Sequence, residues 1–207
     1  MSPRFVIVGT GRSGSGYISR VLTEAGIRTG HEGWWNTWDE RDETLIGDSS
    51  CCALPMGLND YDGQIYWQLR HPLDFIQSMV ASVVVDPHLS LFQRLAPDAD
   101  PADVLGFAMA MWVGHIEAAA RYRPPWWRTD QITADLIVQI GGSAGISVSE
   151  RDAQAAIDSV PTTYNQHRRS GPRRNRRPIL FWSDLYAHDS LLASRIAEYV
   201  DGYGFPP

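Results

Sequence analysis

A glycine-rich segment near the N-terminus carries the residues best suited to chemistry. Between Gly9 and Gly16 the chain reads Gly-Thr-Gly-Arg-Ser-Gly-Ser-Gly, with four glycines, two serines and one arginine. Backbone N–H groups in such a turn, followed by a helix N-terminus, bind anions, and small residues let phosphate oxygens approach the backbone closely. The segment therefore predicts a site for a phosphate or sulfate group, with Arg12 as an additional cation.

One interpretation of this turn is a dinucleotide site. Gly9, Gly11 and Gly14 satisfy the pattern GxGxxG, and Glu32 follows Gly14 by 18 residues, where a ribose-binding acid belongs. The segment 28–30 before Glu32, Arg-Thr-Gly, is a poor second strand for that fold. A GxGxxG pattern alone is weak evidence for a dinucleotide site, so this interpretation stays open as an alternative to the one that follows.

A second motif favours a different nucleotide. Arg70-His71-Pro72 follows the apolar run 65–69 and precedes a helical pattern, and Ser78 comes eight residues after Arg70. An arginine at the end of a strand and a serine about two helical turns later can face one pocket and hold one phosphate.

Together the two motifs resemble the sulfotransferases that use 3′-phosphoadenosine-5′-phosphosulfate (PAPS). Their 5′-phosphosulfate loop follows the first strand as a basic residue, then Ser-Gly-Thr-Thr or a variant, then often an aromatic residue. This chain departs at Ser15-Gly16, where two threonines are commoner. The resemblance implies that the 3′-phosphate is held by Arg70 and Ser78. It also implies a 5′-phosphosulfate loop made of Gly11, Arg12, Ser13, Gly14, Ser15, Gly16 and Tyr17.

Fainter resemblances continue downstream. Residues 127–132 resemble a strand that many bacterial members share, and residues 160–161 with 165–171 resemble the late loop that closes over the 3′-phosphate. The resemblance implies cofactor contacts for Arg168 and Arg169. The segment 168–177 holds six arginines in ten residues, and a solvated loop explains it equally well.

The general base expected for the transfer reaction lies in the segment Gly30-His31-Glu32. In part of the family a glutamate shortly after a glycine is the base, so the resemblance implies Glu32 as general base and His31 as the second candidate. Arg12 would stabilise the leaving phosphate. The tryptophans that follow, Trp34, Trp35 and Trp38, would form either a packed lid or an apolar or sugar-stacking acceptor wall.

Composition narrows the classes of function. The formal net charge of −6 argues against a general nucleic-acid binder, and all 18 basic residues are arginine, which excludes a P-loop or Schiff-base lysine. Cys51 and Cys52 are adjacent, so we expect small buried apolar residues without the ligand companions of a zinc site. No metal is expected. No apolar run is long enough to span a membrane, and the sequence predicts a cytoplasmic protein.

These residues must be positioned by an α/β fold. We expect a single domain over residues 1–207, with three α/β/α layers, a mainly parallel central sheet and the P-loop-kinase-like architecture of sulfotransferases. The patterns predict strands at 5–9, 27–29, 65–70 and 126–130 with a short strand near 179, a loop or short helices over 33–48, and helices at 17–25, 51–58, 74–84, 102–121, 134–140, 150–157 and 191–199.

The predicted activity is sulfuryl transfer from PAPS to a hydroxyl or amine, releasing 3′,5′-adenosine bisphosphate (PAP). The acceptor is unidentified; a carbohydrate, a glycolipid or another small molecule fits. The alternatives are an NAD(P)-type Rossmann enzyme and a noncatalytic nucleotide-binding module.

Overall fold

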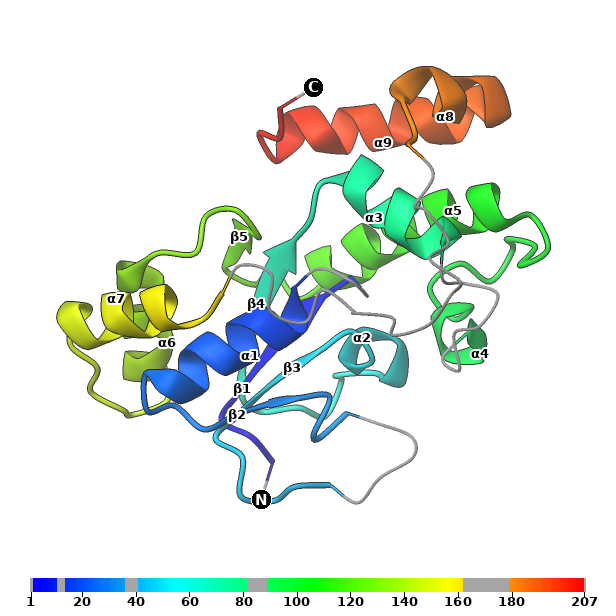
Figure 1. Ribbon diagram of the computed structural model, residues 1–207. Coiled ribbons are helices and arrows are strands. Elements are labelled where there is room, and N and C mark those ends of the chain that lie inside the picture. Colours follow the sequence, from blue (N-terminus) through cyan, green and yellow to red (C-terminus); the bar gives the residue numbers. More distant parts are fainter. Residues whose placement is uncertain (1, 11–13, 36–40, 82–88, 162–178, 207) are drawn as a thin grey trace, which may run out of the picture. The chain divides into compact units, whose positions relative to one another are not determined.

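The structure is a computed structural model that describes residues 2–10, 14–35, 41–81, 89–161 and 179–206 (Figure 1). The chain forms two compact units, each made of two chain segments. Unit 1 comprises Met1–Leu69 and Pro124–Arg168, and unit 2 comprises Arg70–Arg123 and Arg169–Pro207. The expectation of one domain over the whole chain stays a prediction.

Unit 1 is built on a five-stranded sheet in which every pairing is parallel, in the order β2-β3-β1-β4-β5. Because the strands are parallel, their carboxyl ends meet at one edge, which is where ligands bind in open α/β sheets. The strands are β1 (Phe5–Gly9), β2 (Thr29–His31), β3 (Gly47–Ser50), β4 (Gln64–Leu69) and β5 (Trp126–Arg128).

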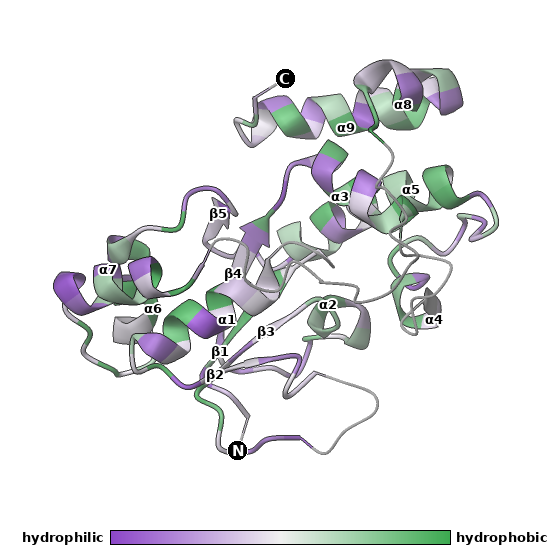
Figure 2. Cartoon of the chain, viewed as in Figure 1, coloured by the Kyte–Doolittle hydropathy of each residue, from purple (hydrophilic) through white to green (hydrophobic). Residues whose placement is uncertain are grey.

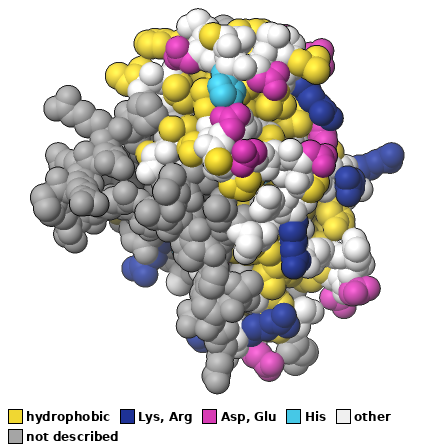
Figure 3. Space-filling view, turned by 90° about the vertical axis from the view of Figure 1, so that its right-hand side faces the viewer, with side chains coloured by type: hydrophobic (Ala, Val, Ile, Leu, Met, Phe, Trp, Pro, Cys, Tyr) yellow, Lys and Arg dark blue, Asp and Glu magenta, His cyan; other side chains and the backbone are white. Residues whose placement is uncertain are grey.

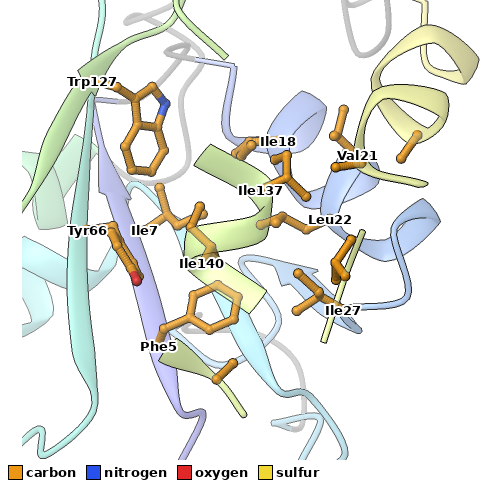
Figure 4. Packing of buried hydrophobic residues seen from close by; sticks show 14 of the residues in the cluster. Phe5, Ile7, Ile18, Val21, Leu22, Ile27, Tyr66, Trp127, Ile137 and Ile140 are labelled. Atoms are coloured by element: carbon orange, nitrogen blue, oxygen red, sulfur yellow. The ribbon is translucent and has the colours of Figure 1, made fainter. Parts of the chain in front are cut away.

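Apolar side chains fill the space between this sheet and three helices of the same unit. β1 is buried along its whole length, as expected for a central parallel strand. Phe5 and Ile7 of β1 belong to the same buried cluster as Ile18 and Leu22, and Figure 4 shows them facing one another. The helices around this cluster are α1 (Ser15–Glu24), α6 (Ala134–Ser143) and α7 (Glu150–Ser159).

The structure corrects two predicted elements of unit 1. The second strand lies at Thr29–His31 rather than at residues 27–29. Residues Gly47–Ser50 form the fully buried strand β3, where a loop and a helix cap were expected. The helix predicted over 51–58 is accordingly shorter, α2 (Ala53–Met56).

Unit 2 is helical in the part that the structure describes. It contains α3 (Pro72–Val80), α4 (Leu89–Phe92), α5 (Val104–Ala120), α8 (Trp182–His188) and α9 (Ser190–Gly202). α5 packs against α3 and α9, and its apolar residues give it a largely green ribbon in Figure 2. The short strand predicted near residue 179 is absent from the described tail, where α8 and α9 follow one another.

The predicted α/β class with a parallel sheet is confirmed, and the architecture is consistent with a three-layer arrangement. Among the described residues, no helix is both long and apolar enough to cross a membrane.

Candidate functional site

Gly14 forms the junction between the glycine-rich turn and α1. Its φ of 86° lies in the left-handed region, and it occupies the N-cap position of α1. A Cβ at this position would lie 3.2 Å from Gln68 Nε2 and 3.2 Å from Thr129 Cγ2. Gln68 belongs to β4 and Thr129 follows β5, so Gly14 lies at the carboxyl ends of these two strands. This is the position of an anion-binding turn in an α/β fold.

Gly14→Ala should lower the free energy of unfolding by about 1–2 kcal/mol, because an L-residue is strained in the left-handed region. Chemical denaturation measures the change. Gly142→Ala is the matched control, since a Cβ there has no atom within 4 Å and the residue lies in α6. That control should be neutral or stabilising by up to about 1 kcal/mol. Equal effects of the two substitutions would show that the left-handed turn is not required.

Ser15, the first residue of α1, links the turn to the proposed base segment. Its buried Oγ lies 2.9 Å from Nε2 of the exposed His31, at the end of β2. The parallel sheet thus brings His31 to the same edge as the first residue of α1, while the predicted neighbour Arg12 lies outside the described residues. A hydroxyl and an imidazole in contact can share or relay a proton at this edge.

Glu32 has an unusual backbone conformation beside β3. Its φ of 58° is left-handed, although it is not a glycine, and its N–H donates to the carbonyl of Ser49 at 3.2 Å. Its half-buried carboxylate accepts a hydrogen bond from Cys51 Sγ at 2.7 Å. Non-glycine residues held in this region are frequently found at functional sites.

Asp48 of β3 holds the chain that follows Glu32. Its side chain is fully buried and accepts the N–H groups of Gly33 at 3.0 Å, Trp34 at 3.1 Å and Trp35 at 3.2 Å. Burial raises the pKa of Asp48, while these backbone N–H groups and the charge of His31 oppose the increase. Sequence patterns carry no signal for this role of Asp48, because a buried aspartate is recognised only through its hydrogen-bond partners.

Asp48→Asn should lower the free energy of unfolding by about 1–3 kcal/mol, because an amide offers one acceptor oxygen in place of two and turns an NH₂ group toward backbone donors. Urea denaturation is the measurement. The exposed Asp60 provides the control, and Asp60→Asn should change stability by less than about 0.5 kcal/mol. Equal stability of the two variants would exclude Asp48 as the residue that organises this loop.

Cys51 and Cys52 follow β3 directly, and sequence reasoning assigned them no partner. Both are buried free thiols, and their sulfurs lie 3.9 Å apart. The hydrogen bond with Cys52, burial and the neighbouring charge of Glu32 together raise the pKa of Cys51. Glu32 also lies beside the two cysteines, and the expectation that no metal binds there stays a prediction.

The second predicted phosphate motif is a strand-to-helix junction, as expected. β4 ends at Leu69, and α3 starts at Pro72 in the first helical position. The Arg70 backbone carbonyl accepts a hydrogen bond from Trp112 Nε1 at 3.2 Å, and the Arg70 side chain is half-buried. Ser78 lies in α3 and is 1% exposed.

The remaining predicted cofactor residues are only partly described. Tyr17 is half-buried against the core of unit 1, and burial, with a smaller contribution from Asp158, raises its pKa. Gly16 is buried in α1. Gly11, Arg12, Ser13, Arg168 and Arg169 lie outside the described residues, as does Trp38.

The two described tryptophans after Glu32 have different surroundings. Trp35 is 6% exposed and packs edge-on against Tyr61, with ring centroids 5.2 Å apart, so it belongs to the core. Trp34 is half-buried, and the Arg41 guanidinium lies 5.2 Å from its ring centroid. Of the two, Trp34 is the candidate for an acceptor wall.

Comparison with known protein families and with curated proteins gives no match to the chain. The site is therefore defined by its own geometry: an α/β protein with the left-handed Gly14 before α1 and a Ser–His pair at the carboxyl edge of a parallel sheet.

Proposed function

We propose that the protein transfers a sulfuryl group from PAPS to a hydroxyl or amine, by means of a P-loop-like sulfotransferase site. The observation that carries the proposal is the glycine turn, which enters α1 through Gly14 at the carboxyl edge of the sheet. The N-terminus of α1 offers N–H groups to the 5′-phosphosulfate. The buried hydroxyl of Thr10, the residue that follows β1, has no hydrogen-bond partner among the residues that the structure describes, and it adds a polar group at this edge.

The strand order weighs against the dinucleotide alternative. In the Rossmann fold the order is 3-2-1-4-5-6, so the second strand lies beside the first and carries the ribose-binding acid. Here β3 separates β2 from β1, and Glu32 follows β2. Glu32 is therefore one strand farther from the turn than the Rossmann pattern requires.

Arg70 supports a second phosphate contact through its place in the chain. It is bonded to Leu69, the last residue of β4, and β4 pairs directly with β1. The carboxyl ends of β4 and β1 therefore lie at the same edge of the sheet. We assign Arg70 to the 3′-phosphate, with Ser78 as the second ligand that the resemblance implies.

The proposed reaction needs one base and a stabilised leaving group. The acceptor oxygen attacks the sulfur in line, the bond from sulfur to the 5′-phosphate oxygen breaks, and Glu32 takes the acceptor proton. The products are a sulfate ester and PAP. The turn amides and Arg12 stabilise the charge that develops on the leaving phosphate.

The partner expectations are consistent with a small-molecule enzyme. On the face drawn in Figure 3, the basic side chains of the described residues are scattered among acidic and hydrophobic ones. A nucleotide and a small acceptor stay the proposed partners, and the cytoplasm stays the proposed location.

Turnover with sulfur-labelled PAPS tests the proposal. We would incubate the protein with PAPS and a panel of sugars, glycolipids, phenols and amines, and measure labelled product together with PAP. Acceptor-dependent release of PAP is expected. Binding of PAP without any turnover across the panel would favour the noncatalytic nucleotide-binding module.

A further inference from the structure

Three potential metal ligands gather at the carboxyl ends of β2 and β3. Glu32, Cys51 and Cys52 each offer one ligand atom, and these atoms lie within 4.8 Å of one another. The pairing of His31 with Ser49 brings the ends of the two strands together, which places Glu32 beside the cysteines. All three residues belong to unit 1.

The sulfur geometry matches that of a bound thiophilic cation. Two thiolates bound to tetrahedral zinc at 2.3 Å are about 3.8 Å apart, since the S–Zn–S angle is close to tetrahedral. The sulfurs of Cys51 and Cys52 are 3.9 Å apart. Glu32 lies 2.7 Å from Cys51 Sγ, and a cation that replaces the shared proton requires about 3.5 Å between these atoms. Cation binding therefore requires a small movement of the half-buried Glu32 side chain.

Hydrogen bonds hold the ligand residues in position. Ser50 Oγ accepts the N–H of Cys52 at 3.0 Å and donates to the carbonyl of Trp35 at 3.2 Å. The N–H of Glu32 is fixed to the carbonyl of Ser49. Ordering of this kind around the ligands is typical of metal sites, because it keeps the donor atoms convergent.

The donor atoms suit a thiophilic cation. A divalent cation deprotonates the thiols that coordinate it and compensates the negative charge of the carboxylate and the thiolates. Two sulfurs and one carboxylate oxygen select a thiophilic ion such as Zn²⁺ over Mg²⁺ or Ca²⁺.

We propose that Glu32, Cys51 and Cys52 form a binding site for one thiophilic divalent cation, with a fourth position for a ligand that is not a protein residue. Three protein ligands and one open position are the arrangement of zinc sites that accept water or a small ligand. A cation bound to the Glu32 carboxylate would also prevent this residue from acting as the general base for the acceptor. Cation binding itself does not depend on the proposed sulfuryl transfer.

Titration of the reduced, metal-free protein with Co²⁺ tests the site. We expect a thiolate-to-cobalt charge-transfer band in the near ultraviolet that saturates at one cation per chain and disappears when Zn²⁺ is added. The chain contains no cysteine besides Cys51 and Cys52, so any such band reports these two residues. Absence of the band, or saturation at one cation per two chains, would overturn the proposal.

Competition with a chromogenic chelator then measures the contribution of each ligand. Glu32→Gln should weaken Zn²⁺ affinity at least tenfold, and Cys52→Ser should weaken it more and reduce the charge-transfer intensity. Glu43→Gln, an exposed change between β2 and β3, is the control and should bind as the wild type does. The isosteric Glu32→Gln variant keeps an oxygen that can accept from Cys51, so it should remain folded. Wild-type affinity in that variant would exclude Glu32 as a ligand.

Discussion

Arg70→Ala should weaken the binding of PAP by roughly 100-fold while the protein stays folded. A guanidinium bound to a phosphate contributes charge-assisted hydrogen bonds of about 1.5–3 kcal/mol, which corresponds to roughly 10- to 150-fold in affinity. Alanine keeps the backbone carbonyl that accepts from Trp112 Nε1. Isothermal titration with PAP measures the affinity, and circular dichroism with a thermal melt measures the fold.

Two further variants make the Arg70 result specific. Arg70→Lys keeps the charge without the two-pronged guanidinium, so its affinity should fall between those of wild type and Arg70→Ala. Arg151→Ala removes one exposed arginine from α7 and should change the affinity less than twofold. Unchanged PAP binding by folded Arg70→Ala would reject the assignment of the 3′-phosphate to this residue.

Glu32→Gln should lower kcat by about 10²- to 10⁴-fold, the usual contribution of a general base. The amide cannot take the acceptor proton, but its oxygen can still accept from Cys51 Sγ. The dissociation constant for PAP should therefore stay within about twofold of wild type, because the nucleotide contacts are made elsewhere. Steady-state turnover of labelled PAPS, together with PAP titration, measures both quantities.

His31 provides the comparison for this experiment. Its ring contacts Ser15 Oγ at the first turn of α1, so His31→Gln tests the second candidate for the base. With Glu32 as the base, His31→Gln should retain much more turnover than Glu32→Gln. Full activity of Glu32→Gln with a large loss in His31→Gln would transfer the role of base to His31.

The parts of the fold that could be predicted from the sequence are those with a simple apolar pattern. β1 and β4 read as buried strands flanked by glycine or by proline, and α5 carries a long helical pattern. β3 was missed because its residues, Gly-Asp-Ser-Ser, are polar and yet completely buried. Tertiary hydrogen bonds explain that burial, since the carboxylate of Asp48 accepts three backbone N–H groups from a separate segment. Hydrophobic periodicity cannot detect such a strand.

The candidate site could also be predicted only in part. Parallel strands predict the segment His31-Glu32 at the sheet edge where the glycine-rich turn begins, and the structure shows His31 in contact with Ser15, the first residue of α1. The contact of Glu32 with Cys51 depends on β3 lying beside β2, so it could not be inferred without that strand. The turn residues 11–13 and the arginines 168 and 169 lie outside the described part of the chain, and their roles stay predictions.

A thermal-shift comparison of three nucleotides tests the identity of the nucleotide most directly. A ligand that binds only the folded protein stabilises it by about 2.7 kcal/mol at 100 times its dissociation constant. PAP should raise the melting temperature in a concentration-dependent way and well beyond the effect of equal concentrations of NADH or ATP. Stabilisation by NADH without any response to PAP would contradict a bisphosphate nucleotide site and favour the dinucleotide interpretation.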